Sequence, residues 1–102
     1  VYGTFTCTNP VFPEAGTLDV IVLTNPSGFE VKNAPTPDGK RTLGVNDFYN
    51  CSPNPVKRNG KWHMECGYDS KVPYTTASFM KTRSGSFSFR IGYPVRFMCK
   101  KK

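Results

Sequence analysis

The stretch "AGTLDVIVLTN", residues 15–25, decides the fold, because its apolar pattern fits two kinds of secondary structure. Leu18, Val20 and Val22 alternate with their neighbours, as in a half-buried β-strand. Val20, Ile21 and Val22 are β-branched, and such side chains favour strands over helices. Leu18, Ile21 and Val22 also follow the i, i+3, i+4 spacing of an amphipathic helix, so spacing alone leaves both structures open.

The length of the chain sets the scale of the fold. A chain of 102 residues predicts a single domain, residues 1–102, with one modest core. No apolar stretch approaches the roughly 20 residues that a membrane-spanning helix needs, so no membrane partner is expected. We expect a monomer.

The four cysteines predict disulfides. Their spacing differs from zinc-binding CxxC pairs, and a single histidine cannot complete a Cys/His metal site, so we expect no metal and no cofactor. Four cysteines allow three pairings. The favoured one joins Cys7 to Cys99, which ties the ends of the chain together, and Cys51 to Cys66. Disulfides persist in oxidising compartments, which predicts a secreted protein whose signal peptide has been removed.

The positive charge lies mostly in the second half of the chain. The net charge is +7, and residues 51–102 hold eleven basic side chains against Glu65 and Asp69. This asymmetry suits an anionic partner, such as RNA or an acidic protein surface. The alternative is that the charge serves only solubility.

Several stretches predict antiparallel strands. "YGTFTCT", residues 2–8, alternates as a first strand, and "VKRNGKWHMECGY", residues 56–68, predicts a hairpin turning at Asn59-Gly60. Residues 74–99 predict two strands joined at 83–85, followed by a last strand after Tyr93-Pro94.

Two other stretches predict less order. "NAPTPDGKRTLG", residues 33–44, is rich in Pro, Gly and Asn and predicts an exposed loop with a turn at residues 37–39. The terminal "CKKK", residues 99–102, predicts a frayed, solvated tail.

Alternation also sorts the side chains into core and surface. On the second arm of the hairpin, Trp62, Met64 and Cys66 face one way, and Lys61, His63 and Glu65 face the other. The aromatic residues expected in the core are Trp62, Phe79, Phe87, Phe89 and Phe97. Because phenols tolerate water, the tyrosines are better contact residues, namely Tyr49, Tyr68, Tyr74 and Tyr93.

Four short features resemble a known family. They are "FTC" at residues 5–7, "FPEAGTLDVIVL" at 12–23, "KTRSGSFSF" at 81–89, and a cysteine three residues from the carboxyl end. Together they resemble the ribonuclease-like effectors secreted by powdery mildew fungi, the RALPH effectors, although the aromatic residue before the cysteine is a phenylalanine where that family usually has tyrosine.

The resemblance implies an α+β fold like that of small fungal guanyl-specific ribonucleases. That fold has an amino-terminal β-hairpin and one α-helix packed on a twisted antiparallel β-sheet. The helix would include the stretch at residues 15–25, with Pro13 and Glu14 just before it in the first turn and Asn25-Pro26 at its end. An all-β fold, with an extra strand in this place, is the alternative.

The resemblance also implies a function. It suggests a virulence or avirulence effector that reaches the host cell cytoplasm, suppresses plant defence, binds host proteins and is recognised by intracellular immune receptors. The related ribonucleases cleave RNA with a glutamate, a histidine and an arginine on neighbouring strands. Here His63 and Glu65 lie on the same arm of the hairpin, and the strand that should carry the catalytic acid has no histidine. We therefore expect a catalytically inactive binding module. The alternatives are an active secreted ribonuclease or ribotoxin, and a basic antifungal protein.

The candidate partner surface gathers polar and basic residues of the carboxyl half. Arg90 alternates with Phe89 and Ile91, so its side chain should point away from the core. The outer face to which it points is the place where the related ribonucleases hold the phosphate. The interaction expected here is weak, sequence-independent RNA binding. The full set of candidate residues is Lys57, Arg58, Lys61, His63, Glu65, Arg83, Arg90 and Arg96.

Overall fold

A computed structural model describes residues 2–11, 16–24, 27–36, 39–54, 62–68, 76–82, 85–91 and 96–102. These residues form strands and one short 3-10 turn, η2 (Val45–Asp47). The strands are β1 (Gly3–Thr8), β2 (Thr17–Thr24), β3 (Ser27–Thr36), β4 (Gly39–Leu43), β5 (Phe48–Asn54), β6 (Trp62–Tyr68), β7 (Thr76–Lys81), β8 (Phe87–Ile91) and β9 (Arg96–Lys101).

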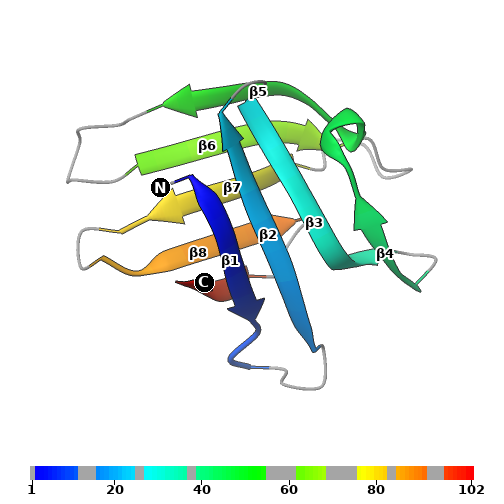
Figure 1. The fold of residues 1–102 in the computed structure, drawn as a ribbon, viewed down its shortest axis with the longest axis vertical. Coiled ribbons are helices and arrows are strands. Elements are labelled where there is room, and N and C mark those ends of the chain that lie inside the picture. Colours follow the sequence, from blue (N-terminus) through cyan, green and yellow to red (C-terminus); the bar gives the residue numbers. More distant parts are fainter. Residues whose placement is uncertain are drawn as a thin grey trace.

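The strands form one antiparallel sheet that curls on itself. The order is β4-β3-β2-β1-β9-β8-β7-β6-β5, so the first and last strands pair in the middle, and β4 and β5 are the two edges. Figure 1 shows β1, β2 and β3 running steeply in front of β6, β7 and β8. The curled sheet thus makes two layers whose facing sides enclose the core.

Aromatic rings join the two layers. Phe29 of β3 lies edge-on to Phe48 of β5, with ring centroids 5.6 Å apart, and to Phe89 of β8 at 5.5 Å. Phe5 of β1 contacts Phe79 of β7 at 4.7 Å. The predicted aromatic core is confirmed, because three of its members are buried and the other two pack against them. The buried members are Phe79, Phe89 and Phe97, and the partly buried ones are Trp62 and Phe87.

The expected α+β fold is wrong, because residues 17–24 form strand β2 and not a helix. Leu18, Val20 and Val22 are buried and alternate with half-exposed or exposed neighbours. β2 pairs with β1 on one side and β3 on the other, so its backbone is satisfied on both edges. The β-branched residues therefore adopt the structure that their side chains favour, which is the all-β alternative.

The expected loop at residues 33–44 is also wrong in part. β3 continues to Thr36, and β4 follows from Gly39, with Thr36 and Gly39 opposite each other. β4 reads as a loop because only Leu43 is buried among its five residues. The predicted turn falls on Pro37 and Asp38, which lie outside the described residues.

The predictions for β1 and for the carboxyl half are confirmed at strand level. β6 pairs with both β5 and β7, β7 with β8, and β8 with β9. Trp62, Met64 and Cys66 face the core, while Glu65 is exposed. The Asn59-Gly60 turn lies outside the described residues.

Both favoured disulfides are present in the structure. Cys7 and Cys99 lie directly opposite each other in the β1–β9 ladder and are bonded. Cys51 is bonded to Cys66. The β5–β6 register shifts between Tyr49 and Ser52, the part of β5 that contains Cys51.

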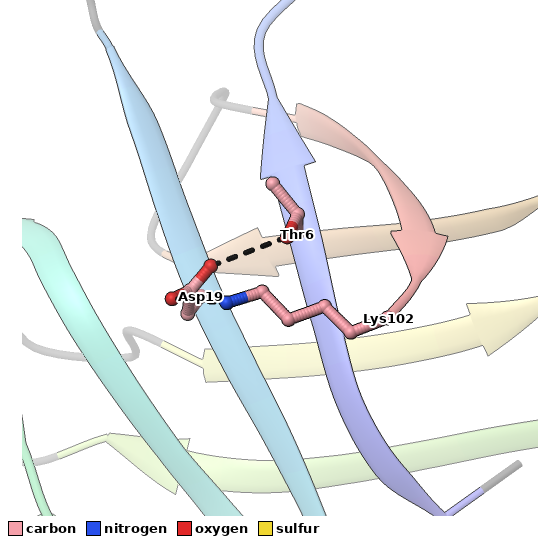
Figure 2. Close-up of polar contacts among 3 residues, drawn as sticks. All are labelled: Thr6, Asp19 and Lys102. Carbon is pink, nitrogen blue, oxygen red and sulfur yellow. Dashed lines mark hydrogen bonds and ion pairs between the residues drawn. The ribbon is translucent and has the colours of Figure 1, made fainter.

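The carboxyl tail is not frayed. β9 extends to Lys101, and the backbone N–H of Lys102 donates to the carbonyl of Thr4 at 3.0 Å. Figure 2 shows the side chain of Lys102 reaching across β1 to Asp19, with Nζ 3.0 Å from Oδ2. The hydroxyl of Thr6 donates to the other oxygen of Asp19 at 3.4 Å. The prediction failed because the tail's charge suggested solvation, whereas its backbone completes the ladder with β1.

Candidate functional site

A row of polar side chains crosses β6 to β9 on the face away from the core. Residues directly opposite each other on neighbouring antiparallel strands point to the same face of the sheet. Glu65 lies opposite Ser78, Ser78 opposite Arg90, and Arg90 opposite Arg96. Their chain neighbours Phe89 and Phe97 are buried, so this arginine row (Glu65, Ser78, Arg90, Arg96) faces outward.

Two arginines face each other at one end of the arginine row. Arg90 and Arg96 are both exposed, and directly opposite residues have Cβ atoms about 5 Å apart. Like charges in this position repel and destabilise the sheet. The ion pairs found among the described residues are His63–Glu65 and Lys102–Asp19, and neither includes an arginine. The pair therefore offers two guanidinium groups to an external anion.

His63 and Glu65 contact each other on the same outer face of β6. Nε2 of His63 lies 3.7 Å from Oε2 of Glu65. Arg90 is two strands away from Glu65, across Ser78, which is roughly 10 Å at the usual strand spacing. His63, Glu65 and Arg90, the three residue types that the related ribonucleases use, therefore share a face. The acid and base candidates, His63 and Glu65, contact each other at the surface and lie apart from the arginine.

Only part of the predicted basic surface falls on described residues. His63, Glu65, Arg90 and Arg96 share the outer face of β6, β8 and β9. The others lie outside the described residues, namely Lys57, Arg58, Lys61 and Arg83.

Of the four tyrosines predicted as contact residues, the structure describes the side chain of Tyr49. Tyr49 is 52% exposed and lies opposite Gly67, with its ring over the position where a side chain would stand. The side chain of Tyr68, and Tyr74 and Tyr93 as a whole, lie outside the described residues. Tyr49 sits on the edge strand β5, apart from the arginine pair.

A hollow of about 570 Å3 lies beside β9 and was not predicted from the sequence. It is lined by Thr6, Thr8, Gly85, Ser86, Phe87, Met98, Cys99, Lys100 and Lys101. The predicted Cys7–Cys99 disulfide could have indicated part of its lining. Placing Cys7 opposite Cys99 in antiparallel strands also places Thr6 opposite Lys100 and Thr8 opposite Met98.

Other kinds of site find no support in the part of the chain that the structure describes. No three His, Cys, Asp or Glu side chains there are grouped as a metal ion would require. No helix in the same residues has the length and apolar character of a membrane span. Comparisons with protein-family models, curated proteins and solved structures found no match to the chain.

Proposed function

We propose that this protein is a secreted, non-enzymatic binding module that holds RNA on the outer face of β6 to β9. The observation that carries the proposal is the exposed pair of arginines, Arg90 and Arg96, directly opposite each other on β8 and β9. Guanidinium groups suit phosphate, because their planar donors match two oxygens at once. A phosphate held between the two side chains would offset their mutual repulsion.

The overall charge supports the same partner. A net charge of +7 attracts polyanions over a distance and releases their counterions on binding. Ser78 lies beside Arg90 in the row and adds a hydroxyl donor. Such contacts are made with the RNA backbone, so the binding should be independent of base sequence.

The resemblance to the mildew effectors supports less than it first implied. The ribonuclease-like fold requires a helix where the chain has β2, so this fold is not part of the proposal. The remaining part is a proposal based on short motifs: delivery into the host cell cytoplasm and binding to plant proteins, including immune receptors. The two disulfides support secretion, since such bonds persist in oxidising compartments.

RNA binding can be measured by fluorescence anisotropy of a labelled single strand at low and high salt. The expected dissociation constant is about 10⁻⁴–10⁻⁶ M and weakens steeply with salt. Arg90→Glu should weaken binding at least several-fold, whereas Arg41→Glu, the same charge change on the edge strand β4, should have a smaller effect. Neither variant should lose more than about 0.5 kcal/mol of stability.

Two results would contradict this assignment. Equal losses in the Arg90 and Arg41 variants would mean that net charge alone attracts the RNA. No binding by the parent protein at low salt would assign the arginine pair to an acidic protein partner.

The non-enzymatic part has its own test. Incubated with total RNA, the protein should leave the RNA intact under conditions where a fungal ribonuclease degrades it. His63 contacts Glu65 at the surface, and losing one proton-transfer group typically reduces a rate about 10²–10⁴-fold. Cleavage that disappears in His63→Ala would show that the pair is catalytic.

A further inference from the structure

The hollow beside β9 opens where β8 leaves its neighbour. The β8–β9 ladder stops at the pair Phe87–Cys99, whereas the β1–β9 ladder continues to Phe5–Lys101. β9 therefore has no β8 partner over its last residues, and the hollow lies between it and the turn containing Gly85 and Ser86. A volume of about 570 Å3 is typical of small-molecule sites.

The end of this ladder directs backbone groups into the hollow. Successive residues of an antiparallel strand point their N–H and C=O groups to opposite neighbours. The N–H of Lys102 donates to Thr4 of β1, so the backbone groups of Lys101 point to the other side. That side is the one from which β8 has departed, and Lys101 lines the hollow. The hollow thus contains a backbone donor and acceptor beside its side chains.

The side chains around the hollow combine three kinds of chemistry. Thr8 and Ser86 bring hydroxyls that donate and accept hydrogen bonds, and the hydroxyl of Thr6, which donates to Asp19, can accept one. Lys100, directly opposite Thr6, brings an ammonium group. Met98 is 37% exposed and provides an apolar surface. This mixture suits a ligand that is partly anionic, partly hydroxylated and partly apolar.

The local charge favours an anion. Asp19 lies opposite Thr6, but its carboxylate is held by the ammonium of Lys102, as Figure 2 shows. The ion pairs found among the described residues do not include Lys100. Lys102 therefore offsets the charge of Asp19, and Lys100 leaves the hollow with a net positive charge.

We propose that this hollow binds the phosphate or sulfate monoester of a sugar. The ester group contacts the ammonium of Lys100 and the backbone N–H of Lys101, and the sugar hydroxyls pair with Thr6, Thr8 and Ser86. The C–H face of the ring packs on Met98. This site is separate from the arginine row, so it does not depend on the proposed RNA binding.

The test is an NMR titration of the isotope-labelled protein with glucose 6-phosphate and with glucose 6-sulfate. Both esters should shift the amide signals of Thr6, Thr8 and Met98, and the tighter binder of the two identifies a phosphorylated or a sulfated ligand. Glucose, inorganic phosphate and inorganic sulfate should each bind about tenfold more weakly, since each offers only part of the recognised chemistry.

Matched variants locate the site. Lys100→Gln should weaken ester binding about tenfold. Lys32→Gln is its control, because Lys32 is exposed in the same cross-strand row, opposite Asp19 and three strands away from Lys100. Thr8→Val, which removes a hydroxyl with little change of shape, should weaken binding without changing the fold. Arg90→Glu should leave ester binding unchanged.

Several outcomes would overturn the proposal. Amide signals around the hollow that do not move with either ester would exclude the site. Inorganic sulfate or phosphate binding as tightly as the esters would show a simple anion site without sugar recognition. Equal losses in the Lys100 and Lys32 variants, or a loss in Arg90→Glu, would assign the binding to general positive charge.

Discussion

The centre and the edges of the curled sheet are built in different ways. At the centre, β1 and β9 pair in unbroken register, and Cys7 lies directly opposite Cys99. Near the edges, β3 and β5 carry register shifts. Each shift contains an asparagine with positive φ, Asn33 at 62° and Asn50 at 53°.

The difference shows how the two layers meet. At the centre, a continuous ladder joins strands from the two ends of the chain. Across the layers near β4 and β5, side chains provide the contacts: the ring of Phe29 lies against Phe48, and Gly28 lies near Cys51. Bulges bend and twist a strand, and asparagine tolerates the left-handed backbone that they need. The irregular residues therefore occur where the sheet curls.

The largest expected effect separates the two disulfides. Cys7→Ala/Cys99→Ala should lower the free energy of unfolding by about 4–5 kcal/mol, and Cys51→Ala/Cys66→Ala by about 3 kcal/mol. The reason is loop length, since the bonds span 92 and 15 residues. Urea unfolding of both double variants tests the order. A larger loss from the Cys51–Cys66 pair would show that contacts near the sheet edge outweigh chain entropy.

The same contrast explains what could be predicted from the sequence. Alternation and the cysteines predicted the central strands and the disulfides, because each signal is local or covalent. For residues 17–24, strand propensity was the better guide, and the implied helix was wrong because β2 has a strand on each side. β4 was missed because its exposed side chains give no alternating apolar signal.

The candidate sites depended on register, which is harder to predict. Alternation placed Arg90 on the surface, but its position opposite Arg96 depends on the connection between β8 and β9. The hollow depends on where one ladder stops while the next continues, between Lys101 and Phe87. No single stretch of sequence encodes either relation.

A smaller effect compares one carboxylate from each region. Asp47 of η2 accepts a hydrogen bond from the Gly44 N–H at 2.8 Å, so Asp47→Ala should cost about 1–2 kcal/mol. Asp19→Ala at the centre should cost under about 1 kcal/mol, because its partner Lys102 is half exposed. Urea unfolding measures both, and hydrogen exchange at Lys102 should accelerate only in the Asp19 variant. The reverse order of cost would mean that the tail contact is a major part of stability.

The smallest effect has the opposite sign and concerns the other end of the β8–β9 ladder from the hollow. Arg96→Glu replaces a repulsive pair by an attractive one, so it should raise the free energy of unfolding by about 0.2–1 kcal/mol. The gain should shrink at high salt, which screens exposed charges. The same variant should weaken RNA binding, because it removes one of the two guanidinium groups.

Arg96→Ser, which removes the repulsion without adding attraction, should give a smaller gain in the free energy of unfolding. If Arg96→Glu is more stable and binds RNA less well, the arginine pair serves binding at a cost in stability. If Arg96→Glu is instead less stable, both arginines support the fold.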